Sequence, residues 1–110
     1  KLNFLLDTGS NSSHIDSKVL HDSNIEYQTI NIKHTVIGIE GKEQETTPCI
    51  LTVKYKDTIF TSEFCITDLS GAFNAIKSEY GVQIHGIIGN EFFQKYKYVI
   101  DFQELMCYIK

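Results

Sequence analysis

The sequence LNFLLDTGS at residues 2–10 is an apolar run that ends in an acidic turn. The apolar residues predict a buried β-strand, and the tripeptide Asp7-Thr8-Gly9 predicts a tight turn at the end of that strand. Asp7 would then be a carboxylate held in place by a buried strand. A single carboxylate in such a position implies a second carboxylate that faces it.

The composition limits the class of protein to which this carboxylate belongs. The chain has 110 residues, of which 42% are hydrophobic and 12% aromatic, and this is enough for one compact domain with a core. The formal net charge is −4 and no Arg is present, which argues against a nucleic-acid binder. No apolar stretch approaches the roughly twenty residues that cross a bilayer, so we expect no membrane insertion by this segment.

The cysteines and histidines do not predict a metal site or a cofactor. Cys49, Cys65 and Cys107 are odd in number and lack the close spacing of zinc ligands, so we expect reduced thiols in the core. Unpaired thiols favour the cytoplasm, whereas a removed signal peptide would allow the periplasm or the cell envelope. The four histidines are scattered along the chain without a second ligand at a recognisable spacing.

Alternating apolar residues and turn residues predict a mainly β chain. A short helical turn capped by Asp16 or Ser17, a helix begun by Ser70 and ended by Gly81, and a helix from Asn90 interrupt the strands. The predicted strands cover residues 2–6, 12–16, 27–39, 49–56, 59–67, 98–102 and 105–109. Residues 42–47 are expected to form a polar return arm after the third of these strands.

Two segments in this order resemble the catalytic elements of the retropepsin-like aspartic peptidases, which have a single lobe. LLDTGS at residues 5–10 resembles the catalytic turn, and GIIGNEFF at residues 86–93 resembles the late apolar-Gly segment with its helix. The resemblance covers nearly all of residues 1–110, as one lobe that lacks the first strand of the family. It implies a mainly β fold, namely a closed β-barrel-like acid-protease lobe with one or two short helices.

The resemblance implies an aspartic endopeptidase that hydrolyses internal peptide bonds. Cleavage of an amide needs a general base to activate water and a general acid to protonate the leaving nitrogen, and two carboxylates that share one proton supply both. Asp7 would be the catalytic residue, paired with Asp7 of a second copy in a homodimer. Neither a metal ion nor another cofactor is implied.

The residues that follow Asp7 would support the catalytic turn. By resemblance, the Thr8 hydroxyl bonds across the dimer axis to the partner turn. Gly9 allows a close approach that a Cβ would block, and Ser10 can donate a hydrogen bond to the outer oxygen of the carboxylate. Taken alone, each residue is also an ordinary component of a turn.

The resemblance assigns a flap and a pocket wall as well. Ile37, Gly38 and Ile39 resemble the tip of the flap that closes over substrate, although a plain β-hairpin explains them equally well. The wall of the substrate pockets would include Ile87, Ile88 and Gly89, which otherwise read as a buried strand that leads into a helix.

Two positions depart from the retroviral pattern. Retroviral members have an acid just after the catalytic motif and an Arg just after the late segment, whereas this chain has Asn11 and Asn90. We expect the two side-chain amides to contact each other in place of that ion pair. The predicted hairpin over residues 98–109 is also longer than the retroviral ending.

Two alternatives remain for the activity. The same fold could serve as a catalytically silent binding or assembly module, because fold alone does not fix activity. The chain could also be one lobe of a longer two-lobed peptidase. The partners expected for a peptidase are a polypeptide substrate and either a second copy or a second lobe, with no nucleic acid.

Overall fold

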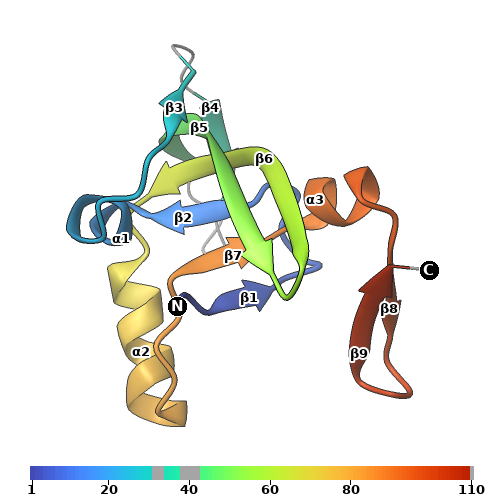
Figure 1. The fold of residues 1–110 in the computed structure, drawn as a ribbon. Coiled ribbons are helices and arrows are strands. Elements are labelled where there is room, and N and C mark those ends of the chain that lie inside the picture. The colour runs from blue at the N-terminus through green and yellow to red at the C-terminus, as the bar shows by residue number, and fades with distance from the viewer. Residues whose placement is uncertain (31–33, 38–42, 110) are drawn as a thin grey trace.

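A seven-stranded sheet forms the body of the molecule (Figure 1). The structure is a computed structural model, and it describes residues 1–30, 34–37 and 43–109. The strand order is β1-β7-β2-β6-β5-β3, and β4 pairs with β5 outside this path. The strands are β1 Phe4–Leu6, β2 His14–Asp16, β3 Gln28–Thr29, β4 His34–Ile37, β5 Glu43–Tyr55, β6 Thr58–Thr67 and β7 Gly86–Ile88.

The predicted closed barrel is wrong, because this sheet is open. Its edge strands β1 and β3 each pair with a single neighbour. No pairing joins these two edge strands within the described residues, so the sheet does not close on itself. Three helices accompany the strands rather than one or two, so the described part of the chain is a mixed α/β, strand-rich fold. They are α1 Ser17–Asp22, α2 Ser70–Tyr80 and α3 Asn90–Lys95.

Within the described residues, the β5–β6 hairpin supplies four of the nine buried residues of the core cluster, namely Cys49, Leu51, Phe60 and Phe64. Its register runs from the Tyr55–Thr58 pair to the Thr47–Ile66 pair. The polar segment before residue 48 pairs with β4, as a return arm should, and continues directly into the rest of β5. The predicted alternation is confirmed, since Cys49 and Leu51 are buried and Thr52 is exposed. Ile15, Ile88 and the phenylalanines of α3 belong to the same cluster.

The helix ends follow the predicted residues only in part. Gly81 ends α2 in the left-handed conformation, with φ of 74°, as its position predicts. Asp16 does not cap α1, because its Oδ1 accepts a hydrogen bond from the Leu69 N–H instead. Ser70 begins α2, but the side chain that accepts from its N–H and its hydroxyl belongs to Asp68.

The strand β1 is less buried than its sequence predicts. Leu5 is 38% exposed and Leu6 is 53% exposed. The reason is the edge position of β1, which pairs only with β7. The apolar run before Asp7 is therefore an edge strand with exposed leucines, and not a strand covered on both faces.

The chain ends in a separate hairpin, as predicted. Strands β8 (Tyr98–Asp101) and β9 (Met106–Ile109) form a two-stranded sheet, which projects away from the main sheet in Figure 1. Stacked aromatic rings hold its base, where Tyr98 lies 6.1 Å from both Phe60 and Phe92 between ring centroids. The Tyr96 hydroxyl, just before β8, donates a 2.6 Å hydrogen bond to the Thr61 carbonyl.

The cysteines are free thiols. Cys49 and Cys65 are buried and Cys107 is partly buried, which confirms the prediction for the first two. Burial raises the pKa of the Cys49 thiol to about 11. Over the described ranges, no helix has the length and apolar character needed to span a membrane.

Replacing Gly89 with Ala should destabilise the fold by at least about 2 kcal/mol, because overpacked sites lose about 1–3 kcal/mol or more. A Cβ at this position would lie 2.3 Å from the backbone oxygen of Ser12, which no side-chain rotation can relieve. Gly71→Ala is the control, since a Cβ there meets nothing within 4 Å. Within α2 it should be neutral or stabilise by up to about 1 kcal/mol. Urea unfolding measures both changes, and equal midpoints for the two variants would contradict the predicted clash.

Candidate active site

The Asp7 carboxylate is held by its own turn. The Asp7 N–H donates to the Ile88 carbonyl at 2.9 Å and so extends the β1–β7 pairing by one residue, and the Ser10 N–H closes the turn on the Asp7 carbonyl at 3.2 Å. The Gly9 N–H then donates to Asp7 Oδ1 at 2.9 Å. Within the described ranges Oδ2 has no hydrogen-bond partner, so one oxygen is fixed and the other is available.

Gly9 is required by the closeness of this contact. A Cβ at Gly9 would lie 3.1 Å from Asp7 Oδ1, which is tighter than ordinary van der Waals contact. A side chain at position 9 would therefore push the carboxylate out of its hydrogen bond with the backbone. The structure thus gives Gly9 a role in the turn of its own chain.

Ser10 and Thr8 both form hydrogen bonds near the Asp7 turn, Ser10 through its hydroxyl and Thr8 through its backbone carbonyl. The Ser10 hydroxyl donates to the Ser12 carbonyl at 2.7 Å, so the predicted hydrogen bond to the outer oxygen of Asp7 is absent from this chain. Thr8 is exposed, and its carbonyl accepts a 2.8 Å hydrogen bond from Asn90 Nδ2. The role of the Thr8 hydroxyl across a dimer axis stays a prediction.

The late segment lies directly beside the Asp7 turn, as the resemblance implies. Strand β7 runs between β1 and β2, parallel to the first and antiparallel to the second. The Asn90 and Glu91 N–H groups, which begin α3, donate to the carbonyls of Ser10 and Asn11 at 2.8 and 2.9 Å. The N–H groups of a helical first turn have no partner within the helix, and here the loop after Asp7 supplies their acceptors.

Ser13 is a site-supporting residue that the sequence analysis missed. It is 2% exposed, and its Oγ accepts a 3.0 Å hydrogen bond from the Gly89 N–H. No local pattern distinguishes Ser13 from Ser12 beside it. The requirement comes from the distant Gly89, whose buried N–H needs an acceptor.

The predicted contact between the amides of Asn11 and Asn90 is wrong. The Asn90 amide donates to the Thr8 carbonyl, and Asn11 takes part through its backbone carbonyl, which accepts from the Glu91 N–H. Where the retroviral pattern has an ion pair, the Asn90 amide of this chain binds the backbone carbonyl of Thr8. It links α3 to the turn without any charge.

The residues assigned to the pocket wall and the flap are only partly described. Ile88 is buried in the core and Ile87 is half-buried on β7, opposite Leu5 and His14. Ile37 is the last residue of β4, which pairs with β5 in the hairpin where the flap was expected. Gly38 and Ile39 lie outside the described residues, and their role stays a prediction.

His14 is a buried ionisable group close to Asp7. It is 8% exposed, and its Nδ1 lies 3.0 Å from the Thr67 hydroxyl oxygen. Burial lowers the pKa of His14 below its usual value of 6.5, while the negative charge of Asp7 acts in the opposite direction. The scattered spacing of the histidines gives no sign of this burial, because the strands that bury His14 are β6 and β7.

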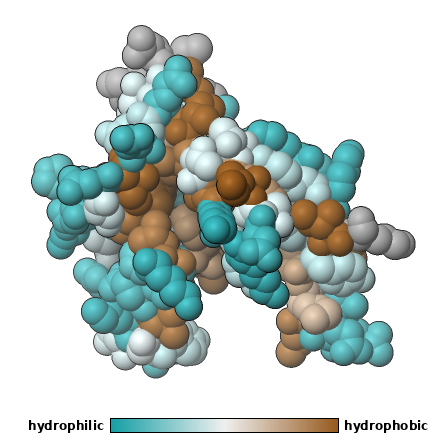
Figure 2. Space-filling model, viewed as in Figure 1, coloured by the Kyte–Doolittle hydropathy of each residue, from teal (hydrophilic) through white to brown (hydrophobic). Residues whose placement is uncertain are grey.

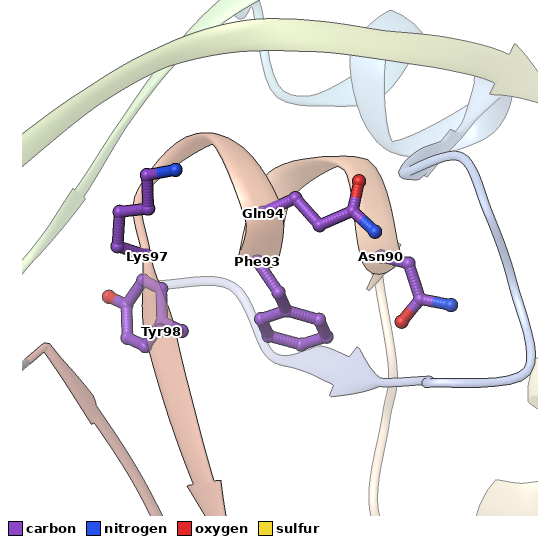
Figure 3. A pocket seen from close by; sticks show the side chains of 5 residues that line it. All are labelled: Asn90, Phe93, Gln94, Lys97 and Tyr98. Atoms are coloured by element: carbon purple, nitrogen blue, oxygen red, sulfur yellow. The ribbon is translucent and has the colours of Figure 1, made fainter.

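A shallow pocket adjoins the site on the side of α3 (Figure 3). Its volume is about 320 Å³, and its apolar part consists of the rings of Phe93 and Tyr98. Asn90 belongs to the same rim, and this residue also binds the Thr8 carbonyl. The pocket therefore continues the surface around the Asp7 turn towards the C-terminal hairpin.

Comparison with known proteins gave one match. A family model described as aspartyl protease matches residues 1–92, a span that includes the Asp7 turn, β7 and the start of α3. No curated protein and no solved structure matched the chain.

The burial of His14 predicts that acid destabilises the fold. The folded chain keeps His14 neutral, whereas the unfolded chain binds a proton near pH 6.5. Its stabilising contribution is therefore complete above about pH 6.5 and is lost as the pH falls towards the lowered pKa. The free energy of unfolding, measured by urea titration at several pH values, should fall less steeply with acid in His14→Asn than in the wild type.

His21→Asn is the matched control for this measurement. The His21 side chain is 89% exposed, so its replacement should leave the pH dependence unchanged. If His14→Asn shows the same slope as the wild type below pH 6.5, His14 is not the group responsible.

Proposed function

Because the chain belongs to the aspartyl protease family, we propose that it is an aspartic endopeptidase in which Asp7 activates water against an internal peptide bond. The observation that carries the proposal is the state of the Asp7 carboxylate. Oδ1 is fixed by the Gly9 N–H, and the turn around it is tied to the N-terminus of α3 by two backbone hydrogen bonds. This arrangement orients one carboxylate oxygen and leaves the other for a proton or a water.

The chemistry requires a second carboxylate. Two carboxylates about 3 Å apart cannot both ionise, so they share one proton. The ionised Asp takes a proton from water while the water oxygen attacks the carbonyl carbon of the substrate. The protonated Asp donates its proton to the carbonyl oxygen. The Asp that took the proton from water then gives it to the leaving nitrogen as the carbon–nitrogen bond breaks. The other Asp takes a proton back from a hydroxyl group of the diol as the new carboxyl group forms, which restores the shared-proton pair.

We propose that a second copy of the chain supplies this carboxylate. A two-fold axis beside the Asp7 turn would bring the same residue from each copy to one point, which makes the interface isologous. Leu6, adjacent to Asp7, is 53% exposed. An exposed apolar side chain beside the axis would be covered by its symmetry mate, which favours association.

The C-terminal hairpin supports the same assembly. A two-stranded hairpin is at best marginally stable by itself, and this one carries Phe102, Leu105 and Met106 at 77%, 86% and 56% exposure. Figure 2 shows apolar surface on this projecting part of the molecule. Since the hairpin follows α3, which binds the Asp7 turn, pairing of two hairpins would bring the two turns together. The polypeptide substrate would then lie between the two copies.

Asp7→Asn should abolish peptide cleavage, with a loss of at least about 100-fold in kcat/KM, while the protein stays folded. The Asn side chain keeps an oxygen that can accept from the Gly9 N–H but cannot serve as a general base. Asp57→Asn, in the exposed β5–β6 turn, is the matched control and should cleave as the wild type does. The assay uses a quenched fluorescent peptide library with circular dichroism as a check on folding. Cleavage that survives in Asp7→Asn, or wild-type protein that never cleaves, would favour a binding module.

Phe102→Lys should weaken the dimer at least about tenfold, because a charged side chain replaces a buried apolar one at the interface. Ile59→Lys is the control, since Ile59 is similarly exposed, at 65%, but lies on β6 and not on the C-terminal hairpin. Sedimentation velocity in the presence of a statine-type transition-state analogue measures the dissociation constant. Equal constants for both variants would exclude the C-terminal hairpin as the interface. A monomer that cleaves peptides would contradict the shared dyad.

A further inference from the structure

A second cavity lies away from the Asp7 turn, where α1, α2 and the chain before β7 meet. Its volume is about 300 Å³, which is at the lower end of the range of about 300–1,000 Å³ for small-ligand sites. No residue that lines it belongs to the Asp7 turn, to β7 or to α3. Figure 1 places α1 and α2 at the opposite end of the sheet from α3.

Asp16 is a buried carboxylate at this cavity. It is 6% exposed, and its Oδ1 accepts a 3.0 Å hydrogen bond from the Leu69 N–H. No fully buried side-chain oxygen within the described ranges lacks a partner, and no hydrogen bond to Asp16 Oδ2 is formed there. The second oxygen is therefore not fully enclosed by protein, and Asp16 is one of the residues that line the cavity.

The described residues provide no cation to compensate this carboxylate. Their one ion pair joins His21 to Asp22, so Lys18, which lines the same cavity, is not paired with Asp16. His85 also lines it, but its Nδ1 accepts a 2.9 Å hydrogen bond from the Asn3 N–H. This nitrogen is therefore engaged with the backbone before β1 and not with Asp16. Among the described residues, Asp16 thus has one carboxylate oxygen without a protein partner, and a bound cation would supply one.

The rest of the lining suits a cation with an aliphatic stem. The Phe73 ring is 2% exposed and Val19 is half-buried, and both line the cavity. Asp22 lies at the rim with its side chain 56% exposed. The lining therefore holds two carboxylates, Asp16 and Asp22, and the side chain of Lys18, which is paired with neither in the described part of the chain. Long amines place methylenes along apolar surface and keep the charged head at a polar edge.

We propose that this cavity binds an alkylammonium or alkylguanidinium group, with the charged head against Asp16 and the methylenes over Val19 and Phe73. Such a group is found in free amines and in the Lys and Arg side chains of polypeptides. The site is independent of the proposed peptidase activity, since it shares no residue with the Asp7 turn.

The test titrates the full chain with n-butylammonium and follows amide shifts in ¹H–¹⁵N spectra. We expect saturable shifts in residues 16–23 and 70–85 with a millimolar dissociation constant, and no saturable shifts with n-butanol, which has the same stem without the charge. Asp16→Asn keeps an acceptor for the Leu69 N–H but removes the charge, and it should weaken binding at least about tenfold. Asp57→Asn is the charge-matched control and should bind as the wild type does.

Asp22→Asn is the second variant to be tested, and it serves in place of Asp16→Asn if that variant does not fold. Asp22→Asn removes the rim carboxylate and should weaken binding about two- to fivefold, as expected for a largely exposed charge. Equal affinity for n-butanol, or unchanged affinity in the variant that folds, would overturn the proposal.

Two capped tripeptides, Gly-Lys-Gly and Gly-norleucine-Gly, distinguish the source of the group. Tighter binding of the lysine peptide than of n-butylammonium assigns the site to a polypeptide segment, and equal binding assigns it to a free amine. If neither n-butylammonium nor the lysine peptide binds, the proposal is wrong.

Discussion

The structure depends on the way the loop after Asp7 caps the N-terminus of α3. The first N–H groups of α3 have no acceptors inside the helix, and the carbonyls of Ser10 and Asn11 have no strand partner, so each set satisfies the other. Gly89 makes the approach possible, because a Cβ there would strike the Ser12 backbone. This contact fixes the turn that carries Asp7, the position of β7 between two strands, and the direction in which α3 leads to the C-terminal hairpin.

Local patterns predicted the features that local physics decides. Gly81 ends α2 because only glycine readily adopts its left-handed conformation, and the alternation through Cys49 and Leu51 sets the buried face of β5. Features decided by distant partners were mispredicted. Asp16 bonds a residue 53 positions away rather than α1, and the edge position of β1 follows from which strands lie beside β7. Sheet closure was mispredicted for the same reason, since it depends on the meeting of two ends.

The sequence pointed to the residues of the Asp7 turn and of β7, but not to the buried residues that support them. Asp7, Gly9 and Gly89 carry signals in the sequence because each needs one residue type at one place. Ser13 and His14 carry none, because their roles come from a buried environment that β6 and β7 create. Leu6, an exposed apolar side chain, lies next to the carboxylate of Asp7 in the chain. Such features are consistent with a surface shaped for a partner.

The pairing of β1 with β7 has a consequence for synthesis of the chain. Phe4 pairs with Gly86, so the two strands are separated by most of the sequence, and long-range pairings of this kind form late in folding. A nascent chain that has not yet released residues 86–91 from the ribosome lacks every backbone hydrogen bond that joins the Asp7 turn to β7 and α3. The Asp7 turn therefore cannot reach its final position against β7 and α3 before residues 86–91 have left the ribosome.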